Sequence, residues 1–309
     1  MSANGGPFDT CYGGQGPGWP MSLTFNGNNQ ISSSGYTYDA AGNLVMDNLN
    51  CYTYDAENRL SSVAPETTPG SDVCGATTMS YLYDPDGRRV ARLQNGAVVK
   101  QYYYDAAGHM ITEANASGNW LRAEIYAGDR HLATWTNNAT YFNHADWLGT
   151  ERARSNSSGA RCETITSLPF GDGQTTAGSC GDPSPNHFTG LERDVESGLD
   201  HTLNRQYPSN LGRWLTPDPA GLMAVRFDAP QTWNMYAYVG NNPLTLADPS
   251  GLSEEVHDYC RGNTYCLASF AQKKQEEKTS EANAQDAAQN QPPPGVPENP
   301  DKRIVQRFQ

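Results

Sequence analysis

The sequence predicts an all-β protein built from a series of antiparallel β-hairpins. A phrase Tyr-x-Tyr-Asp-x-x-Gly occurs four times, with asparagine replacing glycine in the second copy. Tyrosines two residues apart lie on one face of a strand, because side chains alternate between the two faces. Leu, Ile and Val are few whereas Gly, Asn, Ser, Thr and Tyr are many, which favours short strands and turns over helical layers. The aspartates of the four phrases are Asp39, Asp55, Asp84 and Asp105.

The residues that follow each tyrosine pair predict a tight turn. Aspartate suits the first position of a β-turn because its side chain bonds to the backbone, and glycine suits the last. The aspartates are 16, 29 and 21 residues apart, so hairpin length varies while the turn chemistry stays the same. Such units cannot bury an apolar face alone and must stack. We therefore expect one winding sheet in which the repeat tyrosines lie cross-strand from one another on consecutive hairpins.

Composition divides the chain into regions. Residues 1–30 are rich in Gly, Pro and Asn and predict an irregular lead-in, and the hairpin repeats are expected over residues 31–187. Residues 188–252 form a separate region, because the character of the sequence changes at Phe188. Residues 253–309 are predicted to be a variable and mostly disordered tail, because they carry too few apolar groups to offset their ordering entropy. A solvated helix over residues 268–290 is the alternative for part of the tail.

Charge and hydropathy exclude several classes of protein. The 309 residues carry 21 Lys and Arg against 34 Asp and Glu, a net charge of −13, which disfavours nucleic-acid binding. No apolar run approaches the ~20 residues of a membrane span, and no signal peptide is visible at the N-terminus. The mean hydropathy is −0.69. Neither a cofactor motif nor a metal-ligand spacing is present, so we predict no cofactor and no metal.

The seven cysteines are an odd number at irregular spacing. Cys162–Cys180 or Cys260–Cys266 are candidate disulfides if the chain is exported, and free thiols are the alternative.

Several phrases carry a resemblance to a known family. The tyrosine phrases resemble the YD repeats of Rhs proteins, the Tc-toxin C subunit and the teneurins. Phe188–Asp200, Leu203–Gly221, Trp233–Leu244 and Asp248–Leu252 are similar to successive phrases of the Rhs repeat-associated core domain, which would place that domain at residues 188–252. The resemblance implies that the hairpins wind into part of a hollow β-shell that encloses a toxin.

The same resemblance implies a candidate site for self-cleavage. In the family, an arginine and the aspartates of two Asp-Pro-x-Gly phrases are implicated in cutting the chain after the second phrase. By motif these residues are Arg205, Asp218 and Asp248, and the cut bond is Leu252–Ser253. Two carboxylates held close together cannot both ionise easily, so one keeps a proton while the other acts as base on a water.

Two further interpretations of these residues are open. A guanidinium nearby would set which carboxylate stays ionised, or would stabilise the oxyanion that forms. Alternatively, each Asp-Pro-x-Gly phrase is a β-turn and nothing more.

The functional prediction is a C-terminal fragment of an Rhs/YD-repeat shell with a self-cleaving aspartyl site. Its expected partner is the rest of such a shell or another YD-repeat chain. The protein would be secreted or at the cell surface as part of a larger system, and cytoplasmic if expressed alone. The alternative is a non-catalytic structural or carbohydrate-binding module, in which tyrosine and tryptophan rings stack on sugars.

Overall fold

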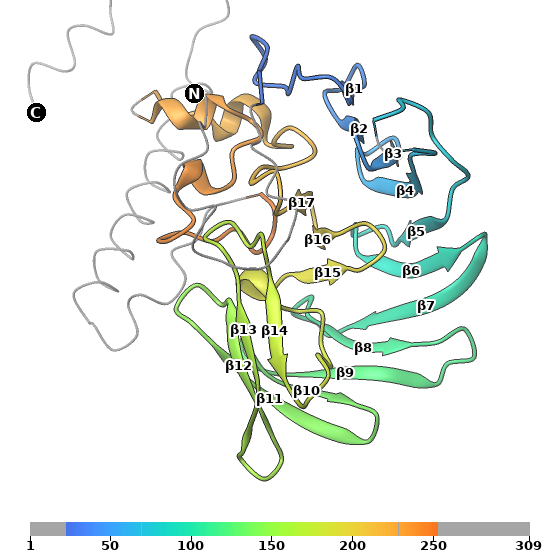
Figure 1. Cartoon of the computed structure of the whole chain (residues 1–309), viewed down its shortest axis with the longest axis vertical. Helices are drawn as coiled ribbons and strands as arrows, with labels where there is room; N and C mark the ends of the chain where they lie inside the picture. Colours follow the sequence, from blue (N-terminus) through green and yellow to red (C-terminus); the bar gives the residue numbers. More distant parts are fainter. Residues whose placement is uncertain (1–22, 69, 228, 253–309) are drawn as a thin grey trace, which may run out of the picture. The chain divides into compact units, whose positions relative to one another are not determined.

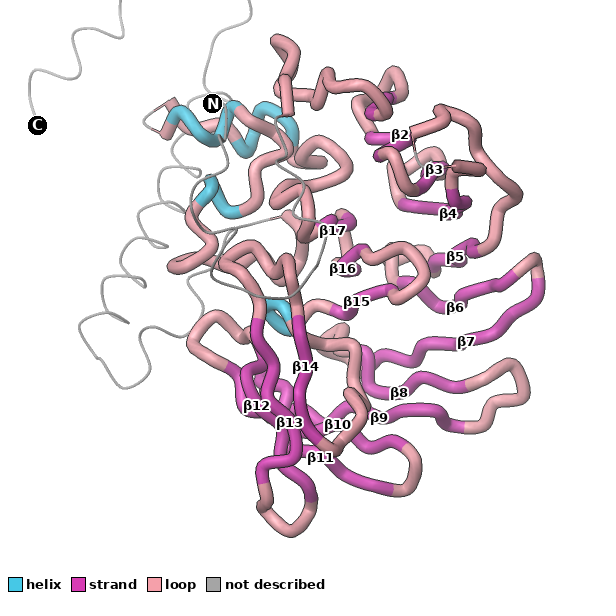
Figure 2. The backbone as a smooth tube through the Cα atoms, viewed as in Figure 1, coloured by secondary structure: helices cyan, strands magenta, loops and turns pink. Residues whose placement is uncertain are grey.

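The computed structural model describes residues 23–68, 70–227 and 229–252. Fourteen strands form one antiparallel sheet in which every strand pairs with the next along the chain (Figures 1 and 2). This confirms the predicted all-β fold of consecutive hairpins; the predicted tail lies outside the described residues. The strands are β1 (Tyr36–Tyr38), β2 (Leu44–Asp47), β3 (Asn50–Tyr54), β4 (Leu60–Pro65), β5 (Met79–Tyr83), β6 (Arg89–Gln94), β7 (Ala97–Tyr104), β8 (Met110–Ala114), β9 (Trp120–Ala127), β10 (Arg130–Thr136), β11 (Ala139–Ala145), β12 (Glu151–Asn156), β13 (Arg161–Thr166) and β14 (Thr175–Gly178).

A second, three-stranded antiparallel sheet follows in the chain and lies against the first (Figure 1). It consists of β15 (Glu192–Asp194), β16 (Leu199–His201) and β17 (Gln206–Pro208). Short 3₁₀ turns connect the remaining segments: η2 (Phe188–Gly190), η3 (Gly221–Ala224), η4 (Pro230–Trp233) and η5 (Val239–Asn241).

The Asp-x-x-Gly phrases form the turns that their sequence predicts. In the first, Asp39 Oδ1 accepts hydrogen bonds from the backbone N–H groups of Ala41 (2.9 Å) and Asn43 (2.8 Å). The N–H of Gly42 donates to the Asp39 carbonyl (3.1 Å), and a register shift interrupts the hairpin just before the turn. Asn58 takes the glycine position of the second turn at φ 60°, a region that asparagine enters more readily than most residues.

The same turn recurs at three places that the tyrosine phrase did not reveal. Asn115, Asp146 and Asn156 each accept backbone hydrogen bonds from the residues two and four positions later, as Asp39 does. An asparagine side chain offers the same carbonyl oxygen as a carboxylate, so the turn needs that oxygen and not its charge.

The paired tyrosines have different tasks. In three of the four pairs the first tyrosine is buried: Tyr52, Tyr81 and Tyr102 are 2–4% exposed, whereas Tyr36 is half-buried. In the same three pairs, the second tyrosine donates its hydroxyl to the backbone carbonyl that begins the return strand of the preceding hairpin. These bonds join Tyr54 to Leu44 (2.7 Å), Tyr83 to Leu60 (2.8 Å) and Tyr104 to Arg89 (2.8 Å).

Our expectation that repeat tyrosines face one another across neighbouring strands was wrong. Tyr52 lies opposite Val63 and Tyr81 lies opposite Arg92, because a return strand separates the tyrosine strands of consecutive hairpins. The second tyrosines bond to the first carbonyl of that return strand instead.

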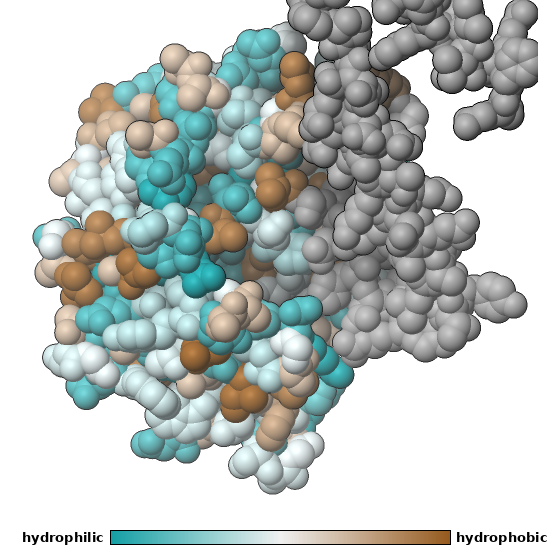
Figure 3. All heavy atoms as spheres, turned by 180° about the vertical axis from the view of Figure 1, so that it is seen from behind, coloured by the Kyte–Doolittle hydropathy of each residue, from teal (hydrophilic) through white to brown (hydrophobic). Residues whose placement is uncertain are grey.

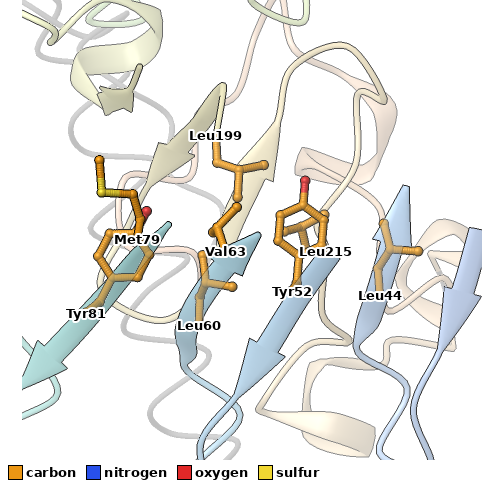
Figure 4. Packing of buried hydrophobic residues seen from close by; sticks show 8 residues of the cluster. All are labelled: Leu44, Tyr52, Leu60, Val63, Met79, Tyr81, Leu199 and Leu215. Carbon is orange, nitrogen blue, oxygen red and sulfur yellow. The ribbon is translucent and has the colours of Figure 1, made fainter. Parts of the chain in front are cut away.

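The contact between the two sheets is apolar at one end and charged further along. Leu199 of β16 and Leu215 pack on Leu60, Val63 and their neighbours from β2–β5 (Figure 4).

Beyond this apolar cluster, Arg89 on β6 is 1% exposed and pairs with Asp194 of β15 at 2.5 Å. Its guanidinium lies over the rings of Tyr81 (5.2 Å) and Tyr102 (4.9 Å). A buried charge is tolerated only when it is paired. A shift of β15 along the large sheet would separate Asp194 from Arg89, so this ion pair fixes the position of β15.

In the described part of the chain, two disulfides close long loops. Cys162 pairs with Cys180, one of the two candidates from the sequence. Cys51 of β3 pairs with Cys74, which the sequence analysis did not predict, because the spacing of cysteines does not reveal which of them meet. The other candidate, Cys260–Cys266, lies outside the described residues.

Over residues 23–252, leaving out 69 and 228, no helix has the length and apolar character needed to cross a bilayer. The same part of the chain holds no group of three or more His, Cys, Asp or Glu side chains arranged to bind a metal. On the face seen in Figure 3, apolar residues form separate groups among hydrophilic ones.

The tyrosine hydroxyl bonds provide a test of what holds consecutive hairpins together. Tyr104→Phe removes the bond to the Arg89 carbonyl and should lower the free energy of unfolding by about 1 kcal/mol in urea titrations. Tyr103→Phe is the matched control, since its exposed hydroxyl bonds only to the Gln101 side chain of the same strand, and should change stability by less than about 0.5 kcal/mol. Equal effects of the two substitutions would contradict a structural role for the inward hydroxyl.

Candidate functional site

A tight turn between β16 and β17 places Arg205. The Thr202 hydroxyl donates to the Arg205 carbonyl (2.7 Å) and accepts from the Arg205 N–H (3.1 Å), so both backbone groups of the arginine are held. Arg205 is 4% exposed, and its side chain enters the protein between the segments that carry the two Asp-Pro-x-Gly phrases.

An aromatic cluster supports the arginine from one side. Phe188, Tyr207, Trp214 and Tyr238 are each at most 3% exposed and pack together with ring centroids 4.5–5.7 Å apart. The Arg205 guanidinium lies 4.4 Å from the centre of the Trp214 ring, in position for a cation–π contact. Aromatic side chains from several segments of the predicted core domain therefore form one apolar cluster, and the Arg205 guanidinium lies against it.

The Arg205 guanidinium brings together the predicted site residues. Its Nη2 lies 3.2 Å from Asp218 Oδ2 and 3.3 Å from Asp248 Oδ2. Its Nη1 donates to the Met235 carbonyl (3.4 Å). Its Nε donates to the carbonyl of Gly251, which directly precedes Leu252. One side chain thus contacts both carboxylates and the segment that leads to Leu252.

Both aspartates also form the turns that the alternative interpretation predicts. Asp218 Oδ1 accepts from the N–H of Ala220 (2.9 Å), and Asp248 Oδ1 accepts from the N–H groups of Gly251 (2.8 Å) and Leu252 (3.1 Å). In each residue Oδ1 caps the turn while Oδ2 faces Arg205. The turn and the ion pair are therefore compatible, and the turn geometry aims the second oxygen at the arginine.

Burial controls the electrostatics of this site. Asp248 is 2% exposed, and burial raises the pKa of its carboxyl above the ordinary value, while Arg205 and the turn N–H groups oppose that shift. Burial also lowers the pKa of Arg205, against the attraction of the two aspartates. A single guanidinium therefore faces one buried carboxylate, Asp248, and one partly exposed carboxylate, Asp218.

The cut bond is described on one side only. Leu252 is 41% exposed, and Ser253 lies outside the described residues.

Two residues of the site were missed by sequence reasoning, namely Trp214 and Asn204. Trp214 lies under the guanidinium, and Asn204 donates its backbone N–H (3.1 Å) and its Nδ2 (3.0 Å) to the Ser250 carbonyl. Tryptophan and asparagine occur in many structural settings, so residue type alone does not indicate these roles. The one available signal for Asn204 is that it directly precedes Arg205 in the sequence.

Comparison with known proteins agrees with this architecture. A family model described as Teneurin YD-shell matches residues 20–244. The chain belongs to this YD-shell family. Its relatives include the tRNA3(Ser)-specific nuclease WapA of Bacillus spizizenii, 30% identical over 238 residues, which cover 75% of this chain and 10% of that protein. The probable deoxyribonuclease RhsB of Dickeya dadantii is 29% identical over 245 residues, 72% of this chain and 16% of that one.

Solved structures share the fold. A crystal structure of TcdB2-TccC3 without the hypervariable C-terminal region superposes with a TM-score of 0.56 at 20% identity, over 75% of this chain and 12% of that one. The Photorhabdus luminescens Tc holotoxin pore gives 0.55, also at 20% identity, over 76% and 12%. This YD-shell chain therefore spans about a tenth to a sixth of the length of the relatives and structures named here.

The paired carboxylates should depend on Arg205 for stability in a pH-dependent way. Arg205→Gln leaves both aspartates without their cation and should lower the free energy of unfolding by about 3 kcal/mol at neutral pH. The pKa of Asp248, already raised by burial, rises further in the folded variant without the opposing Arg205, so protonation of this carboxyl favours the folded state more strongly. The deficit relative to the wild type should therefore shrink as the pH falls, as measured by urea titrations at several pH values.

Arg88→Gln is the control for this prediction. Its guanidinium is 31% exposed and lies 4.0 Å from Asp86, so the loss should stay below about 0.5 kcal/mol. An Arg205→Gln deficit that is independent of pH would mean that the aspartates are not the groups the arginine stabilises.

Proposed function

We propose that this chain forms the closing portion of a toxin-encapsulating YD shell and cleaves itself after Leu252. The observation that carries the proposal is the Arg205 guanidinium, which contacts both Asp218 and Asp248 and donates to the Gly251 carbonyl. A pair of turns needs no such shared cation, whereas cleavage of a peptide bond by two carboxyl groups needs them close together and unequal in proton affinity.

The two aspartates take different parts in the proposed reaction. Asp248 is buried and its pKa is raised, so it holds the proton, whereas the Asp218 side chain is 13% exposed and acts as base. Asp218 takes a proton from water, whose oxygen attacks the Leu252 carbonyl carbon. The C–N bond to Ser253 then breaks, and the Ser253 nitrogen leaves as an amine with a proton from Asp248. The products are a carboxyl group at Leu252 and a new amino terminus at Ser253.

The remaining parts of the proposal concern partners and compartment. Because the chain matches only a small part of its relatives, we propose that it completes a larger shell, with further YD repeats on the same or another chain. Disulfides persist in oxidising compartments, and the Cys51–Cys74 and Cys162–Cys180 pairs support a secreted or cell-surface location. The burial of Tyr52, Tyr81 and Tyr102 argues against sugar binding by the repeat tyrosines.

Self-cleavage is tested by the intact mass of the purified protein after folding. The wild type should yield a fragment that ends at Leu252 and a second that begins at Ser253. Asp218→Asn and Asp248→Asn should abolish the cut, because an amide can neither act as base nor supply the proton. Arg205→Ala should slow it severely, and denaturant should prevent it, since the two phrases meet only in the folded chain.

Asp105→Asn is the matched control. Asp105 also caps a turn with Oδ1, which accepts from the N–H groups of Ala107 and His109, but it lies in the repeats. Asn115 and Asn156 show that asparagine maintains this turn. This variant should cleave at the wild-type rate. A wild-type chain that keeps its full mass would refute self-cleavage and leave the non-catalytic structural module. Cleavage that persists in Asp218→Asn would show that this aspartate only forms a turn.

The pH dependence of cleavage follows from the proton on Asp248. The protonated fraction of a carboxyl whose pKa is raised increases as the pH falls. The rate constant should therefore rise from neutral to mildly acidic pH. Time courses of intact mass across this range measure it. A rate that increases steadily with pH would be inconsistent with a carboxyl acid.

A further inference from the structure

The two backbone carbonyls before Leu252 are both held by the same loop. Asn204 donates its backbone N–H (3.1 Å) and its side-chain Nδ2 (3.0 Å) to the Ser250 carbonyl. The next residue, Arg205, donates Nε to the Gly251 carbonyl. Consecutive residues of the loop therefore hold consecutive carbonyls of the second Asp-Pro-x-Gly turn, in register.

The fit between the loop and the turn leaves little space for another arrangement. Gly251 has φ +73°, and a Cβ at this position would overlap Thr202 Oγ1 and approach the Arg205 nitrogen at 3.0 Å. The glycine therefore permits both the backbone conformation and the close approach. A shift of the turn along the loop by one residue would lose the bonds to both carbonyls and place a side chain against Thr202.

The two loop residues, Asn204 and Arg205, have different hydrogen-bond partners. The Arg205 guanidinium is shared among two carboxylates and two carbonyls, whereas both Asn204 donors go to one carbonyl, which lies two residues before Leu252. Asn204 thus fixes the backbone without contacting the reacting groups. Because Leu252 is 41% exposed, the turn that precedes it is what places its carbonyl relative to the aspartates.

We infer that Asn204 is a positioning residue that sets which peptide bond is cut. This rests on the proposed self-cleavage. Two bonds to one carbonyl fix both the position and the direction of Ser250, and hence the reach of the chain from Ser250 to Leu252. Displacement of a reacting bond by about 1 Å costs on the order of a hundredfold in rate, so loss of this clamp should affect both rate and register.

The decisive variant is Asn204→Asp, which keeps the shape of the side chain but replaces its N–H donor with an acceptor that repels the Ser250 carbonyl. Cleavage should slow by roughly tenfold to a hundredfold. The fragment masses should also show cuts at bonds next to Leu252–Ser253 as well as at that bond. The position of the cut is the readout that a merely stabilising residue would not move. Asn210→Asp, an exposed asparagine beyond β17, is the control and should cut as the wild type does.

A second measurement separates the clamp from the chemistry. In the uncleaved Asp218→Asn background, the Asn204→Asp change should speed hydrogen exchange of the Gly251 and Leu252 amides by about tenfold, because the turn that protects them loses one anchor. If Asn204→Asp does not fold, Asn204→Ser replaces it, since its shorter side chain leaves the same carbonyl with one donor.

The outcomes are distinct. Wild-type rate and a single cut in a folded Asn204 variant would overturn the inference while leaving self-cleavage intact. A wild type that never cleaves would refute the proposed function and with it the role of Asn204 in selecting a bond. The exchange rates then decide whether Asn204 holds the turn at all, and unchanged protection would remove that role too.

Discussion

In three of the four repeats, the second tyrosine donates to the carbonyl that begins the preceding return strand. The architecture follows from this hydrogen bond. It joins residues in different hairpins, so it sets how far each hairpin is displaced from the one before. The length of a hairpin can vary without disturbing this hydrogen bond, because the bond is made at the end of the strand next to the turn. The first tyrosines Tyr52, Tyr81 and Tyr102 are then all buried on one side of the sheet.

That shared inner side explains where the candidate site lies. The large sheet presents apolar side chains at β2–β5 and paired charges at β6–β9. On the small sheet, Leu199 packs on the apolar side chains, and its cross-strand partner Asp194 pairs with Arg89. The loop after β16 is therefore held in place by the repeats, and Arg205 enters the protein from a fixed base. The aromatic cluster around Trp214 closes the other side.

The sequence predicts more of the fold than of the site's support. The Tyr-Asp phrases predict hairpins because each depends on local backbone chemistry, but Asn115 and Asn156 escaped notice because their turns use an amide oxygen in place of a carboxylate. The motif indicated Arg205, Asp218 and Asp248 by resemblance alone. That their side chains meet, and that Trp214 and Asn204 hold them, depends on packing between segments far apart in sequence, which no local pattern records.

The small sheet has a mechanical consequence for the array it covers. Hairpins that contact only their neighbours would detach from the ends one at a time. Here Leu199 rests on the strands of the early hairpins, while Asp194 and Glu192 hold arginines of β6 and β9. A force on one hairpin is therefore transmitted through the small sheet to hairpins that are distant along the chain. The repeats should resist force together and not detach one at a time.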